Sequence, residues 1–131
     1  MATILVADDH PDLRGMLKIQ LGKHGFACAE ATNGREVIET LKSSPIDLVL
    51  MDLNMPELDG WQATSAIRAS ETLADIPIIA LTAYSLVGDR ARALAAGCNA
   101  FHCKPFDFEL LLADIVRLLD SEKRNESPLA R

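Results

Sequence analysis

Acidic, hydroxyl and ammonium side chains stand directly after several short apolar runs of the chain. In chain order they are Asp8-Asp9, Asp52, Thr82 and Lys104. Three carboxylates held close together repel one another: at about 5 Å and an effective dielectric near 20, each pair costs roughly 3 kcal/mol. Such a cluster raises its pKa values or binds cations, and one ammonium group cannot balance three negative charges. Because these ligands are all oxygens, the cluster favours Mg²⁺, or alternatively Mn²⁺, over zinc.

A carboxylate beside a divalent cation, a lysine and a threonine is suited to phosphoryl transfer. In this interpretation Asp52 attacks phosphorus in line and becomes an acyl phosphate, while Lys104 and the metal neutralise phosphoryl oxygens. Thr82 and a backbone amide donate hydrogen bonds to the same oxygens. Ordinary structural roles are the alternatives: a helix cap for Asp8-Asp9, a strand-end hydroxyl for Thr82 and a solvated turn for Lys104. The joint occurrence of these residues is more specific than any one of them.

Strand and helix patterns alternate five times along the chain. Apolar runs predict strands over 3–7, 26–31, 46–51, 76–81 and 98–103. Helical spacing predicts a helix after each strand, the third over 61–70, the fourth over 85–96 and the last from Phe108 to Leu119, while Asn33-Gly34 is read as a turn. Short connections and right-handed crossovers make this repeat one parallel sheet with helices on both faces. The carboxyl ends of its strands share one edge, so the chemical side chains are expected to converge there.

Length and composition indicate one globular domain. The chain has 131 residues, 49% of them hydrophobic and 24% charged, enough for a real core. A net charge of -6 argues against a nucleic-acid surface. We expect a domain over 1–120 and a frayed polar tail over 121–131. No apolar run approaches the roughly 20 residues of a membrane span, and no signal peptide is evident, so we expect a cytoplasmic protein. Three cysteines without a CxxC pair, Cys28, Cys98 and Cys103, predict reduced, mostly buried thiols.

The chain closely resembles the receiver domain of two-component response regulators. Four segments carry the resemblance, which runs from about Thr3 to Asp120: Asp8-Asp9, Met51-Asp52-Leu53-Asn54-Met55-Pro56 with Asp59-Gly60, Leu81-Thr82-Ala83, and Lys104-Pro105-Phe106. The resemblance implies a flavodoxin-like (βα)5 doubly wound sheet of five parallel strands, with helices on both faces. This α/β class agrees with the pattern of strands and helices.

The resemblance also implies roles for the acidic residues. Asp52 would accept a phosphoryl group from a histidine kinase or a histidine phosphotransfer protein. Asp9 and Asp52 would contact Mg²⁺ directly together with the carbonyl of Asn54, while Asp8 would assist through water.

Further implied roles fall on the last two strand ends. Thr82, the Ala83 amide and Lys104 would bind the phosphoryl group, and the Lys104-Pro105 peptide bond would be cis. Phe101 stands where the family has its switch aromatic, often tyrosine, and would swing inward as Thr82 moves. A phenylalanine fixed in the core is the alternative.

Other residues near the acidic cluster receive plainer interpretations. Asn54 and Tyr84 would flank the path of the hydrolysing water, and bulky Tyr84 would slow loss of the phosphoryl group; a tyrosine on the output surface is the alternative. His10 is interpreted as a solvated loop residue in preference to a metal ligand. His102 and Cys103 are neighbours on a strand, so they point to opposite faces and cannot chelate one ion.

The leading interpretation is a stand-alone phosphorylation switch, not an enzyme acting on other molecules. Its output would be a surface of the fourth helix, last strand and last helix, offered to a protein target by a monomer or a weak phosphorylation-dependent dimer. A receiver domain separated from a hybrid kinase or multidomain regulator is the main alternative. A phosphatase would place a second aspartate where Asn54 stands. A flavin module would need a Ser/Thr/Gly-rich loop in place of Asp8-Asp9-His10.

Overall fold

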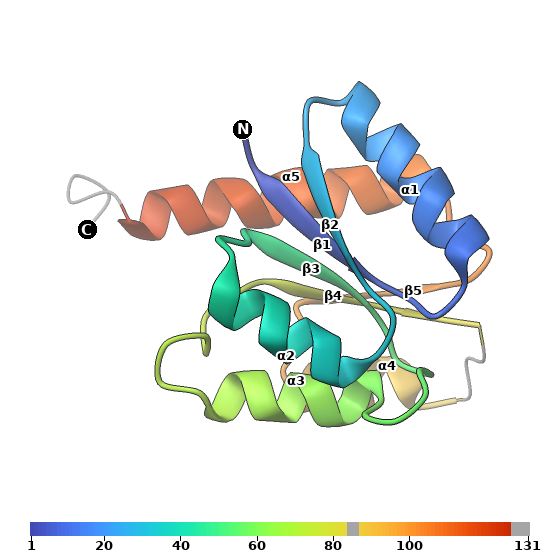
Figure 1. Cartoon of the computed structure of the whole chain (residues 1–131), viewed down its shortest axis with the longest axis vertical. Helices are drawn as coiled ribbons and strands as arrows, with labels where there is room; N and C mark the ends of the chain where they lie inside the picture. Colours follow the sequence, from blue (N-terminus) through green and yellow to red (C-terminus); the bar gives the residue numbers. More distant parts are fainter. Residues whose placement is uncertain (84–86, 127–131) are drawn as a thin grey trace.

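The computed structural model describes residues 1–83 and 87–126, with side chains up to residue 121. Five parallel strands form one sheet in the order β2-β1-β3-β4-β5 (Figure 1). The strands are β1 (Thr3–Ala7), β2 (Ala27–Ala31), β3 (Leu48–Asp52), β4 (Ile78–Thr82) and β5 (Ala100–Cys103). The helices are α1 (Pro11–Lys23), α2 (Gly34–Ser43), α3 (Gly60–Ala69), α4 (Asp89–Ala96) and α5 (Phe108–Glu126). The predicted α/β class is confirmed.

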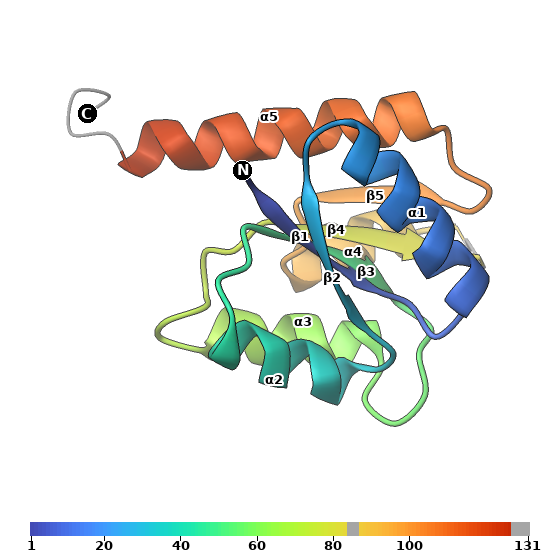
Figure 2. The same cartoon turned by 45° about the horizontal axis from the view of Figure 1, so that its top comes forward.

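The two faces of the sheet are covered by different helices. Helices α1 and α5 lie on one face and α2 and α3 on the other (Figures 1 and 2). Successive residues of β3 show the alternation: Leu48 and Leu50 pack in the core on the α1–α5 side, Val49 and Met51 in the core with α2, α3 and α4. All five residues of β3 are buried. Strand β3 is therefore the central strand of the sheet, and its last residue, Asp52, lies at the carboxyl edge.

Several element boundaries differ from the prediction. Asn33, read as part of a turn, is the N-cap of α2, and its side chain accepts a hydrogen bond from the amide of Glu36. Helix α4 begins at Asp89, later than the predicted residue 85, and residues 84–86 lie outside the described residues.

Helix α5 is longer than predicted. It continues through Ser121 to Glu126, so the polar tail expected to fray from Ser121 is helical over this stretch. The end of α5 extends past the sheet (Figure 1).

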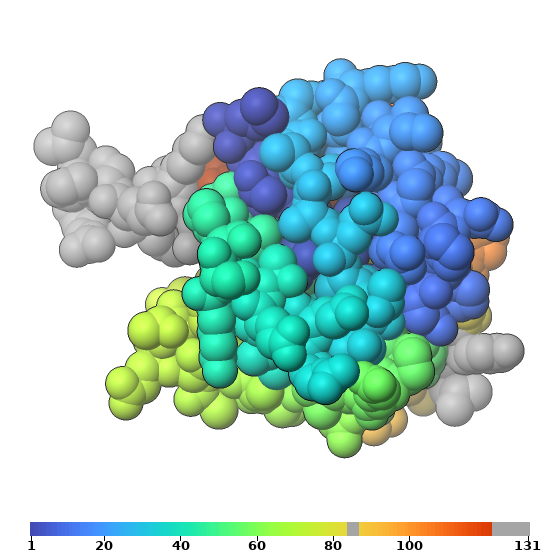
Figure 3. Space-filling model, in the orientation of Figure 1, coloured from blue at the N-terminus to red at the C-terminus, as the bar shows by residue number. Residues whose placement is uncertain are grey.

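Side chains close over the sheet in the space-filling view. The blue side chains of α1 and the teal side chains of α2 lie on either side of the light-blue β2, an edge strand (Figure 3). Leu17 and Leu21 of α1, and Val37 and Leu41 of α2, are buried beneath this surface. Because helices cover the faces of the sheet, the candidate reactive side chains lie at the edge formed by the strand ends.

Candidate functional site

The strand ends bring the predicted chemical side chains together. Parallel pairing sets Ala7 opposite Met51, Asp52 opposite Leu81, and Thr82 opposite Cys103. The residues after β1 and β5, Asp8-Asp9 and Lys104, therefore lie at the same edge as Asp52 and Thr82. This convergence was predicted from the parallel sheet.

Lys104 lies between two buried carboxylates. Its Nζ donates to Oδ2 of Asp8 at 2.6 Å and to Oδ2 of Asp52 at 3.3 Å. Asp8 is 0% and Asp52 2% exposed. A single ammonium group thus serves two carboxylates that have little contact with water, and the centre retains excess negative charge.

Burial raises the pKa of Asp52. The hydrogen bond from the Asn54 amide, 2.9 Å from Oδ1, and the charge of Lys104 lower it, while the carboxylate of Asp8 raises it further. The net direction is upward. A cation placed here would favour the ionised, nucleophilic form of Asp52.

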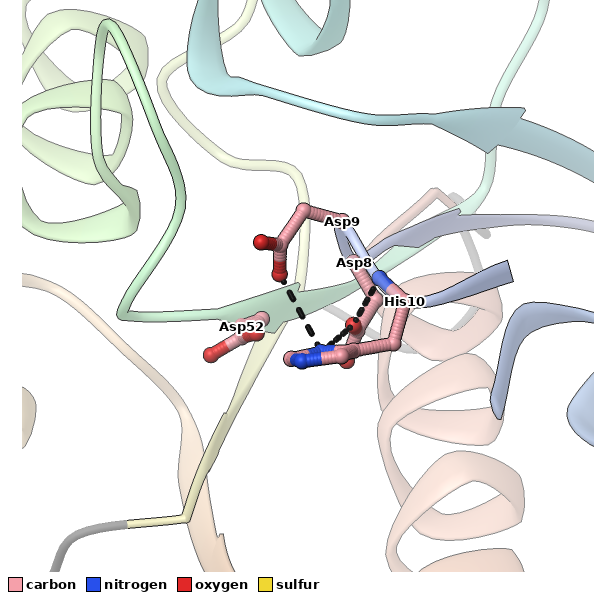
Figure 4. Close-up of side chains that lie close together, drawn as sticks. All are labelled: Asp8, Asp9, His10 and Asp52. Atoms are coloured by element: carbon pink, nitrogen blue, oxygen red, sulfur yellow. Dashed lines mark hydrogen bonds and ion pairs between the residues drawn. The ribbon is translucent and has the colours of Figure 1, made fainter. Parts of the chain in front are cut away.

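Asp9 and His10 complete the acidic end of the site. Oδ1 of Asp9 is buried and accepts no hydrogen bond from the described residues. The ring of His10 lies beside both acids, with Nδ1 at 3.0 Å from Oδ1 of Asp8 and 3.2 Å from Oδ1 of Asp9. Asp8, Asp9, His10 and Asp52 each offer one ligand atom, and these atoms lie within 4.8 Å of one another (Figure 4).

This donor set fits a divalent cation. Buried polar atoms normally accept hydrogen bonds, so the absence of one at Oδ1 of Asp9, whose neighbour in the described residues is the His10 ring, is explained if an ion binds there. Three carboxylates from two strand ends suit Mg²⁺ or Mn²⁺. His10 was interpreted as a solvated loop residue: its side chain is indeed 68% exposed, yet its Nδ1 faces the acids. The backbone amide of His10 also donates to Asp8 Oδ1, at 2.8 Å.

Asn54 connects Asp52 to Thr82. Its side-chain Nδ2 donates to Oγ1 of the buried Thr82 at 2.8 Å. Ala83 follows Thr82 and is exposed, whereas Phe101 is buried in the core on the α4 side. The direct bond between Asn54 and Thr82 was not predicted. Tyr84, assigned to the lifetime of the phosphorylated state, lies outside the described residues.

The segment after β5 adopts the expected backbone. The Lys104-Pro105 peptide bond is cis, as the family resemblance implied. The Lys104 amide donates to the carbonyl of Thr82 at 2.7 Å. Lys104 is thereby held against the end of β4.

Arg14 supports the site and was missed in the sequence. From α1, its Nη1 donates to the carbonyl of Asp8 at 2.8 Å and its Nε to Oε1 of Glu30 at 3.2 Å. The sequence contained one signal of this supporting role, an arginine one turn into the helix that follows Asp8-Asp9. Arg14 fixes the backbone that carries both acids.

His102 and the cysteines lie away from the acidic centre. His102 Nε2 pairs with Oδ2 of Asp114 at 2.7 Å, linking β5 to α5. Burial raises the pKa values of the thiols of Cys28, which is half-buried, and Cys98, which is buried. Cys103 is exposed, so the expectation of mostly buried thiols is wrong for that residue.

Comparison with known proteins identifies the family. The model of the response regulator receiver domain matches residues 4–116. The chain belongs to this receiver family. Its relatives include the sensor histidine kinase RcsC of Salmonella typhimurium, which is 37% identical over 108 residues, or 82% of this chain. The matched region is 11% of that kinase, so the chain spans a small part of its length.

Solved structures agree with this assignment. The signal receiver domain of a histidine kinase from Syntrophus aciditrophicus is 34% identical with a TM-score of 0.88, covering 97% of this chain and 96% of the other. The receiver domain of the sensor histidine kinase PA1611 from Pseudomonas aeruginosa is 34% identical with a TM-score of 0.83, covering 91% and 98%. That structure has a magnesium ion coordinated in its active-site cleft.

The chain is thus a flavodoxin-like receiver domain, homologous to receivers of histidine kinases and to response regulators of two-component systems. Its acidic pocket of Asp8, Asp9 and Asp52 fits a phosphoacceptor site. Among the described residues, no helix combines the length and apolar character needed to cross a membrane.

Proposed function

We propose that this receiver domain is a phosphorylation switch in which Asp52 accepts a phosphoryl group from phospho-histidine. The donor is a histidine kinase or a histidine phosphotransfer protein. The observation that carries the proposal is the convergence of Asp52 with Asp8 and Lys104 at the carboxyl edge of the sheet. Similarity to receiver domains of histidine kinases supports it.

The chemistry is one displacement at phosphorus. A carboxylate oxygen of Asp52 forms an O–P bond while the P–N bond to the donor histidine breaks, and the leaving imidazole takes up a proton. Lys104, with Nζ 3.3 Å from Asp52 Oδ2, is close enough to neutralise a phosphoryl oxygen. The hydroxyl of Thr82 and the amide of Ala83 are proposed to donate to the others. In this proposal the protein catalyses only its own phosphorylation and its own slow dephosphorylation.

A divalent cation is the proposed cofactor. Asp8, Asp9 and Asp52, with the carbonyl of Asn54, would hold Mg²⁺ or Mn²⁺. The buried Oδ1 of Asp9, which accepts no hydrogen bond from the described residues, supports this. When bound, the ion supplies positive charge to the phosphoryl oxygens.

Output is proposed to pass through Thr82 and Phe101. The oxygen of the Thr82 hydroxyl accepts the hydrogen bond from Asn54 Nδ2, and the same hydroxyl would donate its hydrogen to a phosphoryl oxygen. Phe101 is already buried, so movement of its ring would disturb the packing beside α4. The surface of α4, β5 and α5 would then bind a cytoplasmic protein target, from a monomer or a weak dimer.

Intact mass spectrometry tests the proposal. The full chain is incubated with acetyl phosphate, with and without Mg²⁺, beside Asp52→Ala and the control Asp12→Ala, which removes an exposed acid of α1. One Mg²⁺-dependent phosphoryl adduct is expected in the wild type and the control and none in Asp52→Ala. An adduct that persists in Asp52→Ala, or a wild type that accepts no phosphoryl group from any phospho-histidine donor either, would overturn it.

A further inference from the structure

We infer that His10 adds an imidazole nitrogen to the acidic centre, so that the site takes a transition ion of the Zn²⁺ class as well as Mg²⁺. The inference rests on the cation site of the proposed switch and extends its chemistry. It starts from His10 Nδ1, which faces Asp8 and Asp9 at 3.0 and 3.2 Å.

The four donors have the spacing of a single metal centre. Two ligands that are each about 2.1 Å from an ion can be at most about 4.2 Å apart. The candidate ligand atoms of Asp8, Asp9, His10 and Asp52 lie within 4.8 Å of one another. The widest separation exceeds this limit, which applies to ligands on opposite sides of the ion, by about 0.6 Å, so these side chains would close by at least that amount around one ion. Figure 4 shows the His10 ring directed to the same point as the carboxylates.

The backbone holds His10 in place. Its amide donates to Oδ1 of Asp8 at 2.8 Å, and Pro11 begins α1 immediately after it. His10 caps this helix with an extended backbone and without a hydrogen bond from its side chain to the helix, so the ring is not needed for capping. Because the side chain is 68% exposed, water can supply the remaining ligands of an ion.

Nitrogen changes which ion the centre prefers. Carboxylates suit Mg²⁺ and Mn²⁺, whereas imidazole suits Zn²⁺, Ni²⁺ and Cu²⁺. Mg²⁺ favours oxygen ligands and retains several waters, so it gains little from His10. Zn²⁺ gains one good ligand. A Zn²⁺ ion bound through His10 would also occupy the Mg²⁺ position, so Zn²⁺ would compete with phosphorylation.

The other two histidines serve as internal controls. His102 Nε2 is paired with Asp114 at 2.7 Å, and His24 follows α1 with its ring centroid 5.7 Å from that of Phe108. Neither belongs to the group of candidate metal ligands. Any response to a metal ion through this centre should therefore be confined to His10.

Calorimetry and nitrogen NMR test the inference on the full chain. Zn²⁺ and Mg²⁺ are titrated separately into the wild type, His10→Gln and the control His24→Gln. We expect His10→Gln to weaken Zn²⁺ binding by about tenfold or more, since even the hydrogen-bond partners of metal ligands change affinity that much. Mg²⁺ affinity should change less than about twofold, since Mg²⁺ takes oxygen ligands. His24→Gln should match the wild type. In the wild type, Zn²⁺ should shift the Nδ1 resonance of His10 but no resonance of His24 or His102.

Two results would overturn the inference. One is Zn²⁺ affinity that is unchanged in His10→Gln. The other is tighter Mg²⁺ binding in that variant, which would show that the ring acts as a competing cation and not as a ligand. Mass spectrometry of the wild type with Mg²⁺ and no Zn²⁺ reports separately on Asp52. Loss of the phosphoryl adduct alone would refute the proposed function, and His10-independent Zn²⁺ binding alone would refute this inference.

Discussion

At the scale of single residues, Asp52 is an acid in a place where burial opposes its charge. Its pKa is raised above the ordinary 3.8, chiefly by burial. The folded protein therefore binds this proton more tightly than the unfolded chain does. The contribution of Asp52 to stability is present below pH 3.8 and is lost as the pH rises through the raised pKa.

Asp52→Asn should remove this pH-dependent loss of stability in the metal-free protein. At neutral pH the variant should be more stable by about 1 kcal/mol, since a buried charge is removed without changing the shape of the side chain. Urea unfolding with a chelator measures the difference in unfolding free energy between the variant and the wild type, at neutral pH and at pH values approaching 3.8. This difference should shrink as the pH falls. Equal stabilities at neutral pH would contradict this prediction.

Lys104→Met should have the opposite effect. It leaves the carboxylates of Asp8 and Asp52 buried without their shared ammonium group. The free energy of unfolding should fall by about 3 kcal/mol, and saturating Mg²⁺ should restore much of it by supplying the missing charge. Urea unfolding with and without Mg²⁺ checks this. Lys42→Met, at an exposed position of α2, is the control and should change stability by less than about 0.5 kcal/mol. A loss that Mg²⁺ leaves unchanged would argue against the charge explanation.

At the scale of elements, the start of α3 lies against the end of β3. A Cβ on Gly60 would lie 2.3 Å from the carbonyl oxygen of Asp52 and 2.7 Å from Cα of Leu53. Both are backbone atoms, so the strand end itself would have to move. Glycine is therefore required at this position by close approach.

Gly60→Ala should lower the free energy of unfolding by about 3 kcal/mol and slow phosphorylation of Asp52. Gly15→Ala is the control: it lies within α1, where an added Cβ meets no atom within 4 Å. That substitution should stabilise the protein by about 0.5–1 kcal/mol. Urea midpoints and the rate of formation of the phosphoryl adduct report on both. A Gly60→Ala variant that matches the wild type would contradict the crowding seen here.

Arg68 joins the connections that follow α3 and α4. Its guanidinium donates to the carbonyls of Ala74 and Ile76, both at 2.7 Å, and to that of Gly97 at 2.9 Å. It also donates to Oδ1 of Asn99 at 2.9 Å. These bonds tie α3 to the segments that enter β4 and β5.

Arg68→Met should cost about 2–3 kcal/mol of unfolding free energy, because three half-buried carbonyls lose a charged donor. Arg35→Met removes an arginine whose 3.4 Å pair with Glu57 is exposed on both sides. Its cost should stay below about 0.5 kcal/mol. Urea unfolding of the two variants makes the comparison, and similar losses in both would show that the network around Arg68 adds little.

At the scale of the whole molecule, cation binding should be linked to folding. The candidate ligands come together only when β1 and β3 pair, so the proposed Mg²⁺ ion would bind the folded state. At a hundredfold excess over its dissociation constant, Mg²⁺ should add about 2.7 kcal/mol. Asp9→Asn should reduce this gain, because it removes a carboxylate charge from the centre. Thermal unfolding across a Mg²⁺ series measures the effect, and an equal gain in both proteins would place the ion elsewhere.

Much of the architecture follows from local sequence patterns. Apolar runs that end in Asp8, Asp52 and Thr82 predicted the strands and the edge at which they meet. The polar residues from Ser121 to Glu126 carried no such pattern, yet helix α5 continues through them. Asn33 was read as a turn residue because capping depends on a bond to Glu36 that composition does not reveal.

The sequence by itself determined the class of fold, the family and the residues gathered at the carboxyl edge. These depend on periodicity and on residue types at strand ends, which are local properties. Tertiary structure decided which side chains face one another: Asn54 toward Thr82, Lys104 between Asp8 and Asp52, and the His10 ring toward the acids. Side-chain direction depends on backbone angles and on neighbours from distant segments, and the local pattern specifies neither.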